Sequence, residues 1–186
     1  MSSNAPLAQL DRALDYESKG RRFESSRERI ATDDVGFMTQ ALELANEAAR
    51  LGEVPVGSVA VFDGRVIGRG FNRRETDRDP FAHAEFLAMR EAASVLGAWR
   101  LSGVTVYVTL EPCAMCAGAL VQSRVTRLVF GALDPKAGAV GSLYDLAREA
   151  RHNHRLEVMS GVLADECSSV LKTFFAGLRA KKTKTE

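Results

Sequence analysis

A β-hairpin pattern in the first half of the chain constrains its fold more than any other feature. Two apolar runs rich in β-branched residues, 56–62 and 66–71, flank the pair Asp63-Gly64. An Asp-Gly pair between such runs is typical of the tight turn of a hairpin. A sheet that contains this hairpin has antiparallel strands and cannot be wholly parallel.

Strand-like and helix-like patterns alternate along the rest of the chain. Helices are predicted from an N-cap at Asp33-Asp34 onward and over about 82–96, 112–120, 143–149 and 163–178. Further strands are predicted over 105–110, 128–132 and 156–159. This alternation is typical of a layered α/β domain, and together with the hairpin it predicts a mixed central sheet.

The two ends of the chain differ from this pattern. Residues 1–33 carry mixed charge and few large apolar side chains, so we expect a mobile or weakly helical extension there. Residues 181–186 form a short basic tail. We therefore expect one domain over 34–180, a length that is enough to bury a full core.

Composition indicates the compartment. No apolar run approaches the roughly 20 residues that span a bilayer. The first residues lack the basic and apolar segments of a secretory signal. Two of the three cysteines lie in a C-x-x-C pattern, which favours metal or redox chemistry in a reducing environment. We expect a cytoplasmic protein without a membrane span.

Two short motifs carry the chemistry. His83-Ala84-Glu85 supplies an imidazole and a carboxylate, and Cys113 and Cys116 supply two thiols three residues apart. Catalytic zinc sites typically have three protein ligands and leave the fourth position for water. Glu85 is suited to moving protons on that water. H-x-E followed by P-C-x-x-C is the signature of zinc nucleobase deaminases, so the motifs predict a hydrolytic deaminase.

Three other interpretations of the C-x-x-C pattern are a redox dithiol, a structural zinc site and two buried cysteines. A redox dithiol would leave His83 and Glu85 without a role. A structural zinc site would need a fourth His or Cys ligand close by, and the neighbouring sequence supplies none. One difficulty remains, because residues two apart on a regular helix point to opposite sides. His83 and Glu85 can both face a metal only at the irregular entry to a helix.

Arginines are clustered although the net charge is only +1. One cluster consists of Arg65, Arg69, Arg73, Arg74 and Arg78, and a second consists of Arg148, Arg151 and Arg155. Such patches bind phosphates or are simply solvated charged faces. Beside the second cluster, His152, Asn153 and His154 either touch a substrate or belong to an ordinary loop.

Longer motifs extend the pattern around the metal residues. They are Glu53-Val54-Pro55-Val56-Gly57, Gly70-Phe71-Asn72-Arg73, Tyr107-Val108-Thr109-Leu110-Glu111-Pro112-Cys113, Asp134-Pro135-Lys136-Ala137-Gly138-Ala139 and Leu163-Ala164-Asp165-Glu166-Cys167. Through these motifs the chain resembles the bacterial tRNA-specific adenosine deaminases of the cytidine deaminase-like superfamily. The resemblance runs from about Phe37 to Arg179.

The resemblance implies a three-layer α/β/α fold and hydrolysis of the wobble adenosine of a tRNA, with an arginine tRNA as the expected substrate. The products would be inosine in the tRNA and ammonia. It also implies one zinc ion per subunit, bound by His83, Cys113 and Cys116, with Glu85 as the proton shuttle. The expected partners are the tRNA anticodon stem-loop and a second copy of the chain in a homodimer.

The resemblance further implies roles for residues around the metal. Asn72 would hydrogen-bond the flipped nucleotide, and Val56 and the backbone at Ala84 would line its pocket. Asp134 and Lys136 would contact anticodon nucleotides. An anticodon loop suits such a site because its bases are already partly unstacked.

The chain departs from the family pattern at two places, and two other functions compete with tRNA deamination. Phe81 stands where the family commonly has a small polar residue, and the segment before Asp33 is longer than usual. A zinc deaminase for guanine, cytosine or a free nucleoside would explain the metal motifs equally well, but not the segment 134–143. A catalytically silent RNA-binding subunit would have no use for Glu85.

Overall fold

A mixed five-stranded sheet forms the centre of the protein. The computed structural model describes the backbone of residues 23–183 and the side chains of residues 33–181. The strands are β1 (Gly57–Phe62), β2 (Arg65–Phe71), β3 (Thr105–Leu110), β4 (Arg127–Ala132) and β5 (Glu157–Ser160), in the spatial order β2-β1-β3-β4-β5. Strand β1 is antiparallel to β2 and β3, whereas β3, β4 and β5 run parallel. The predicted mixed sheet is confirmed.

The predicted hairpin joins β1 to β2. Asp63 and Gly64 both have left-handed backbone angles, with φ of 49° and 70°. Two consecutive residues with positive φ are typical of the type I′ turn, whose twist matches that of the flanking strands. Asp and Gly are among the residues that tolerate this conformation, which explains why the sequence pattern located the turn correctly.

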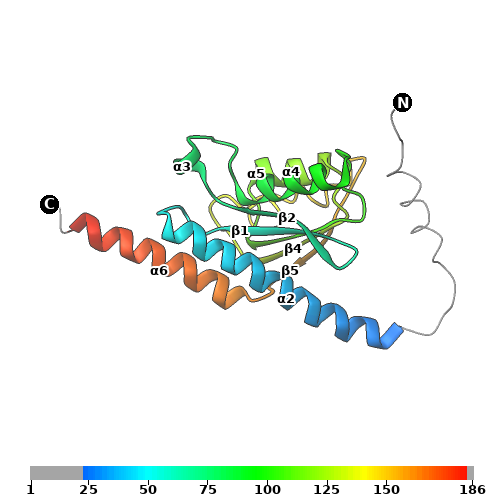
Figure 1. Ribbon diagram of the computed structural model, residues 1–186, viewed down its shortest axis with the longest axis horizontal. Helices are drawn as coiled ribbons and strands as arrows, with labels where there is room; N and C mark the ends of the chain where they lie inside the picture. Colours follow the sequence, from blue (N-terminus) through cyan, green and yellow to red (C-terminus); the bar gives the residue numbers. More distant parts are fainter. Residues whose placement is uncertain (1–22, 184–186) are drawn as a thin grey trace, which may run out of the picture. The chain divides into compact units, whose positions relative to one another are not determined.

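Helices cover both faces of the sheet (Figure 1). On one face lie α4 (Ala84–Leu96) and α5 (Ala114–Gln122), and on the other lie α6 (Ala164–Thr183) and the part of α2 (Phe23–Arg50) from Asp33 onward. Each face has its own apolar core, with Leu120 and Leu128 in the first and Met38 and Val129 in the second. The three-layer α/β/α fold is confirmed.

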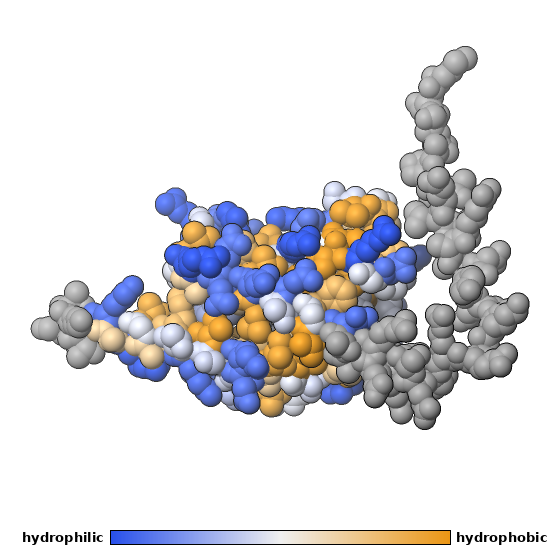
Figure 2. Space-filling model, turned by 60° about the horizontal axis from the view of Figure 1, so that its bottom comes forward, coloured by the Kyte–Doolittle hydropathy of each residue, from blue (hydrophilic) through white to orange (hydrophobic). Residues whose placement is uncertain are grey.

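The surface of the described residues is mixed in character. Hydrophilic and apolar side chains are interspersed over the face shown in Figure 2. Within the described part of the chain, no helix combines the length and the apolar composition needed to cross a membrane.

Two glycines in β2 set the position of α4. A Cβ atom at Gly68 would collide with the backbone oxygen of Ala88, and one at Gly70 would collide with that of Ala84. The helix can therefore lie against the strand at backbone distance. This close approach brings the first turn of α4 next to Asn72, which follows β2 directly.

Two helix predictions were wrong. Helix α2 does not begin at an N-cap formed by Asp33-Asp34 but already at Phe23, so the expected extension 1–33 overlaps it; residues 1–22 lie outside the described part. The segment 143–149 forms bends and an isolated bridge at Asp145, and no helix. Its backbone N–H groups bond to the preceding loop, Leu143 to the Gly138 carbonyl and Leu146 to the Ala139 carbonyl, and these bonds replace a helical pattern.

Asp34 lies within α2, and its buried side chain bonds to Arg127 and Tyr107 on the sheet. Its side chain is bound by both terminal nitrogens of Arg127, each at 2.8 Å, and by the Tyr107 hydroxyl, which donates at 2.7 Å. Only 2% of Asp34 is exposed. The bidentate ion pair ties α2 to β4, and the Tyr107 hydrogen bond ties it to β3.

Replacing Asp34 should destabilise the fold. The variant Asp34→Asn leaves the Arg127 guanidinium without its main counter-charge, although Glu157 remains 3.7 Å away. We expect the free energy of unfolding to fall by about 2 kcal/mol near neutral pH, which is below the range for a completely buried pair. Urea denaturation measures this loss, and Asp33→Asn at the exposed neighbouring position is the control.

The same pair predicts a pH dependence. Burial raises the pKa of Asp34, but the hydrogen bonds from Arg127 and Tyr107 outweigh it, so the folded-state pKa lies below the ordinary 3.8. The stabilisation is therefore complete above pH 3.8 and is lost as the pH falls through the folded-state pKa. A difference between wild type and Asp34→Asn that persists unchanged far below pH 3.8 would contradict this assignment.

Candidate active site

Four strands bring their ends to one edge of the sheet. Because β3 and β4 are parallel, their carboxyl ends lie side by side, with Leu110 opposite Ala132. Because β1 is antiparallel to its neighbours, its first residue, Gly57, lies at the same edge, opposite Phe71 at the end of β2. In open α/β sheets, ligands bind at the carboxyl ends of the parallel strands. All the predicted site residues follow or precede these four ends.

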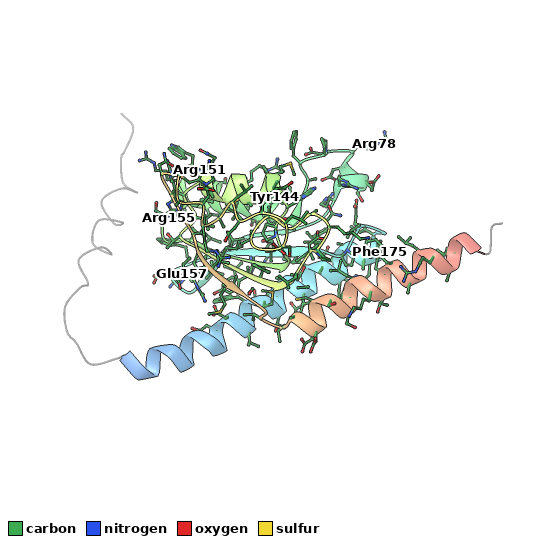
Figure 3. The ribbon with its side chains drawn as sticks, turned by 180° about the vertical axis from the view of Figure 1, so that it is seen from behind. Arg78, Tyr144, Arg151, Arg155, Glu157 and Phe175 are labelled. Atoms are coloured by element: carbon green, nitrogen blue, oxygen red, sulfur yellow. The ribbon has the colours of Figure 1, made fainter. Side chains whose placement is uncertain are left out.

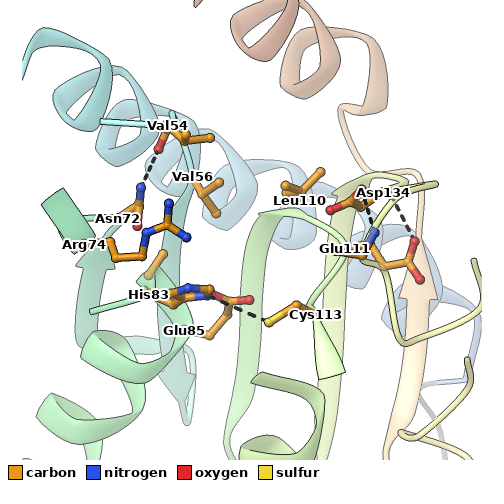
Figure 4. Close-up of a pocket in the computed structure, with 12 residues that line it drawn as sticks. Val54, Val56, Asn72, Arg74, His83, Glu85, Leu110, Glu111, Cys113 and Asp134 are labelled. Atoms are coloured by element: carbon orange, nitrogen blue, oxygen red, sulfur yellow. Dashed lines mark hydrogen bonds between the residues drawn. The ribbon is translucent and has the colours of Figure 1, made fainter. Parts of the chain in front are cut away.

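The three predicted metal ligands meet above this edge (Figure 4 shows His83 and Cys113). His83 is the N-cap of α4 and Cys113 is the N-cap of α5, while Cys116 lies in the first turn of α5. The Nδ1 atom of His83 is 3.9 Å from the Cys113 Sγ and 3.5 Å from the Cys116 Sγ. All three ligand atoms lie within 4.8 Å of one another. The two helix starts therefore converge on one point.

This donor set fits zinc. Tetrahedral zinc with ordinary Zn–S and Zn–N bond lengths holds a nitrogen and a sulfur ligand about 3.6 Å apart. The two observed nitrogen–sulfur separations, 3.5 and 3.9 Å, are close to that distance. One imidazole and two thiolates are typical zinc ligands, and three protein ligands leave one position for a reactant. His83, Cys113 and Cys116 could therefore hold a catalytic zinc ion.

The two thiols differ in their readiness to ionise. Hydrogen bonds from Cys116 and His83 lower the pKa of Cys113 to about 3. The Cys113 hydrogen bond, together with burial, raises the pKa of Cys116. The thiolate at Cys113 in turn raises the pKa of His83. One thiolate is thus already stabilised at the position where a cation would bind.

Glu85 lies beside the ligands in the first turn of α4, and it is 4% exposed. His83 has an extended backbone, with ψ of 150°, because it precedes the helix. The helical rule that separates residues two apart does not apply to this pair, so His83 and Glu85 both line the pocket. Burial raises the pKa of Glu85. The spacing difficulty in the sequence is thereby resolved.

A pocket of about 220 Å³ opens at this edge. It is lined by Val54, Val56, Asn72, Arg74, His83, Ala84, Glu85, Leu110, Glu111, Cys113, Asp134 and Ala137. The predicted substrate residues Val56, Asn72, Ala84 and Asp134 are therefore brought together. Lys136 is exposed in the loop after Asp134 and is not part of the lining.

The Asn72 side chain is oriented by a buried carboxylate. Its Nδ2 group donates to Glu53 at 3.2 Å and to the Val54 carbonyl at 3.3 Å. Glu53 is 1% exposed and also accepts from the Thr76 N–H at 2.6 Å. Both partners of Nδ2 can only accept, so the Asn72 carbonyl oxygen remains available to a ligand.

Sequence reasoning assigned no role in the site to Glu53, Arg74 or Glu111. Glu111 is 2% exposed, and its carboxylate accepts hydrogen bonds from the loop that carries Asp134. Burial raises the pKa of Glu111, but the bonds from the Ser142 hydroxyl and backbone N–H groups outweigh it and hold the pKa below its ordinary value. Glu53 and Glu111 belong to the sequence motifs, but their partners lie too far along the chain for spacing to indicate them. Arg74 belongs to the first arginine cluster.

The arginines of the two clusters lie at different places on the molecule. Arg74 lines the pocket, whereas Arg73 pairs with Asp77 at 2.9 Å. Arg151 and Arg155 of the second cluster lie at the opposite end of the molecule from Arg78 (Figure 3). Within the second cluster, Arg151 pairs with Glu149 at 2.9 Å. These ion pairs are exposed and contribute little to stability.

The side chains of the polar loop 152–154, beside the second arginine cluster, bond to neighbouring parts of the protein. His154 bonds to the Val125 carbonyl at 2.6 Å, and His152 bonds to the Leu146 carbonyl at 3.1 Å. Asn153 accepts from Arg124 at 2.7 Å. None of the three lines the pocket described above.

Phe81, the departure from the family pattern, does not enter the pocket lining either. It is 58% exposed, and its ring lies 6.5 Å from that of Phe86. The turn before His83 is held by Asp79, which accepts from the Phe81 N–H at 2.9 Å. A larger residue at this position leaves the metal ligands in place.

Comparison with known proteins gives consistent matches. The model of the MafB19-like deaminase family matches residues 32–179. The chain is 53% identical over 151 residues to the tRNA-specific adenosine deaminase of Bacillus subtilis (strain 168), covering 81% of this chain and 94% of that protein. It is also 53% identical over 150 residues to the enzyme of the same name from Haemophilus influenzae, covering 80% of this chain and 87% of that one.

Solved structures show the same relationship. A structure from studies of A-to-I editing by tRNA:A34 deaminases at the wobble position of transfer RNA is 45% identical, with a TM-score of 0.71, and covers 73% of this chain and 99% of that one. The guanine deaminase from Nitrosomonas europaea is 28% identical, with a TM-score of 0.64, and covers 76% and 84%.

The ligand assignment predicts a selective loss of metal. We expect Cys113→Ala to reduce bound zinc from one ion per chain to a small fraction, because the variant removes the thiol with the lowered pKa. Cys167→Ala is the matched control, since Cys167 is a buried thiol on α6 outside the pocket. Elemental analysis of both purified variants measures this. Full zinc occupancy in Cys113→Ala would refute the assignment.

Proposed function

Since the chain belongs to the family of the tRNA-specific adenosine deaminases, we propose that it hydrolyses the wobble adenosine of a tRNA anticodon, in particular that of an arginine tRNA, to inosine. The observation that carries this proposal is the group of three metal-type ligands beside a buried glutamate in one pocket. The 53% identity to tRNA-specific adenosine deaminases favours adenosine in RNA over free guanine.

The proposed cofactor is one zinc ion per chain, held by His83, Cys113 and Cys116. When bound, zinc supplies a Lewis acid that makes water a nucleophile near neutral pH. The chain contributes the donor set and the fourth, open position.

Glu85 is the proposed proton carrier. Overall, water adds its oxygen to C6 of adenine, the C6–N bond breaks and ammonia leaves. The Glu85 carboxylate takes a proton from the attacking water and passes it to N1 of the ring. It then takes the proton of the new C6 hydroxyl group and passes it to the exocyclic amine, which departs as ammonia and leaves a C6 carbonyl. Its burial beside the ligands keeps it within reach of these atoms and away from bulk water.

The pocket walls hold the base in place. Val56 and Leu110 offer apolar surface to the faces of a purine, and the carbonyl oxygen of Asn72 accepts a hydrogen bond from the nucleotide. The backbone at Ala84 lies beside the metal ligand His83 and completes the lining. A single extruded nucleotide matches a pocket of about 220 Å³ better than a stacked duplex does.

Arg74 supplies positive charge at this pocket. It is exposed, and its guanidinium group forms a weak surface pair with the exposed carboxylate of Glu75 at 3.3 Å. Figure 4 shows its guanidinium group pointing toward the space above His83. We propose that Arg74 binds a phosphate next to the flipped nucleotide, while Asp134 and Lys136 contact its neighbours in the anticodon loop.

The assembly and boundaries follow the same reasoning. We propose a homodimer, as the family resemblance implies, and a catalytic domain over 34–180, with 1–33 and 181–186 outside it. The family match over 32–179 supports these bounds. The proposed compartment is the cytoplasm, because free ligand thiols require a reducing environment.

Inosine formation tests the proposed reaction directly. The zinc-loaded protein is incubated with an arginine tRNA anticodon stem-loop that has adenosine at the wobble position, and inosine is quantified by nucleoside mass spectrometry. We expect Glu85→Gln to retain zinc and to lower kcat by at least about 100-fold, the usual contribution of a general acid–base group. Glu91→Gln, on the exposed face of the same helix, is the control.

Parallel reactions separate the alternatives. Adenosine moved by one nucleotide in the loop tests the wobble position, and free adenosine, cytidine and guanine test other deaminase activities. Ammonia from free guanine without inosine in RNA would assign the chain to the guanine deaminases. Turnover by Glu85→Gln at the wild-type rate would remove Glu85 from the mechanism.

Arg74 has a separate test. We expect Arg74→Ala to raise KM for the stem-loop while kcat stays nearly constant, and to reduce the slope of log affinity against log salt by about one, as for a lost phosphate contact. Arg78→Ala is the control, because Arg78 is an exposed arginine in the same segment outside the pocket lining. An unchanged salt slope in Arg74→Ala would contradict the phosphate contact.

A further inference from the structure

Glu111 connects the two loops that form one wall of the pocket. It directly follows β3 and stands two residues before the metal ligand Cys113. One carboxylate oxygen accepts from the backbone N–H groups of Val140, at 3.0 Å, and Ser142, at 2.9 Å. The other accepts from the Asp134 N–H at 3.1 Å and from the Ser142 hydroxyl.

These four donors occupy the carboxylate completely. An ionised carboxylate has about four acceptor positions, and here each oxygen uses two. Glu111 lines the pocket but has no acceptor position left for a substrate proton or a metal. Unlike Glu85, Glu111 therefore serves to bind the loop and does not exchange protons with a ligand.

The loop 134–142 closes tightly around this anchor. A Cβ atom at Gly138 would collide with the Glu111 carboxylate and with the Asp134 carbonyl oxygen. Gly138 also forms a backbone bridge with Cys113, and the Ala139 N–H donates to the Pro112 carbonyl at 2.9 Å. The loop is thus bonded on both sides to the segment that carries a metal ligand.

Few other contacts determine where the outer part of the loop, residues 133–137, lies, whereas Ala139 and Val140 are buried in the core. Between Leu133 and Ala137 the chain is mostly exposed, and Asp134 uses its own carboxylate to accept from the Lys136 and Ala137 N–H groups at 2.9 and 3.2 Å. These local bonds shape the turn but do not attach it to the pocket. The bond from the Asp134 N–H to Glu111 does attach it.

We propose that Glu111 is a positioning residue that holds the loop 134–142 at the mouth of the pocket and thereby sets the affinity for RNA. This inference rests on the proposed RNA substrate. Through Glu111, the loop that presents Asp134 and Lys136 is kept in register with the metal-ligand segment around Cys113. The carboxylate acts on the substrate only through this loop.

The variant Glu111→Gln tests the proposal. It keeps the size of the side chain but replaces one acceptor oxygen by an NH2 group, which would face hydrogen-bond donors. We expect KM for the stem-loop to rise on the order of tenfold, as for the loss of a charge-assisted hydrogen bond, with kcat changed by less than about threefold. Zinc content should stay at the wild-type level.

Hydrogen exchange gives a readout that does not depend on the substrate. In Glu111→Gln the amides of Asp134, Val140 and Ser142 should exchange faster, while those of β3 keep wild-type protection. A uniform loss of protection would instead indicate general destabilisation and would overturn a specific positioning role. Unchanged exchange and unchanged KM would overturn the proposal as well.

A second variant reaches the same contact from the loop. Gly138→Ala leaves the carboxylate intact but forces the loop away from it, so it should reproduce the rise in KM and the faster exchange. Gly36→Ala on α2, where an added Cβ meets nothing within 4 Å, is the matched control. If Glu111→Gln fails to fold, Gly138→Ala carries the test alone.

Two further outcomes are decisive. A fall in kcat with KM unchanged would place Glu111 in the chemistry and overturn its assignment as a positioning residue. Failure of the proposed function is recognised separately, because wild type itself would then make no inosine. The exchange experiment would still report in that case whether Glu111 holds the loop.

Discussion

The pairing of β3 with its two neighbours is the constraint on which the site depends. Its parallel partner β4 and its antiparallel partner β1 bring the end of β3, the end of β4 and the start of β1 to one edge. The loops that carry Cys113, Asp134 and Val56 leave the sheet at these points. Cys113 and Cys116 follow β3, whereas His83 follows the β1–β2 hairpin. A shift in register between β1 and β3 would therefore separate the two thiols from the histidine.

Polar contacts between residues far apart in the sequence then hold α2 and the parts of the pocket in place. Asp34 ties α2 to the sheet through Arg127, Glu53 orients Asn72, and Glu111 holds the loop after β4. Each is a nearly fully buried carboxylate with several donors or a cation, which is the condition under which burial of a charge is tolerated. Apolar packing builds the layers. Glu53 and Glu111 bond to the loops at the edge that carries the site, whereas Asp34 holds α2 at the other end of β4.

The metal motif was predictable because its chemistry is local. Two cysteines three residues apart and a histidine with a following glutamate identify their partner ion by type and spacing. The sequence also located the hairpin, since Asp63 and Gly64 are suited to positive φ. It could not show how His83 and Glu85 face the same pocket. That depends on His83 being the N-cap of α4, where its backbone is extended and does not follow the helical spacing.

The two helix predictions were wrong because contacts outside the local sequence decided the structure. Asp34 fits a helix N-cap by residue type, but its partner Arg127 lies on β4 and keeps it inside a longer helix. The segment 143–149 has helical spacing, but its backbone N–H groups bond to residues in the preceding loop and it turns instead. Glu53 and Glu111 gained roles only when the fold brought their partners to them, and Arg74 gained one because the fold places it at the pocket.

X-ray absorption at the zinc edge of the purified wild-type protein tests the central claim most directly, namely that two helix starts converge to make one catalytic metal site. The account predicts two sulfur ligands at about 2.3 Å and nitrogen or oxygen ligands at about 2.0–2.1 Å completing four-coordination. A spectrum with four sulfur ligands, or with none, would contradict it, because His83, Cys113 and Cys116 could not then be the ligands of a single open site.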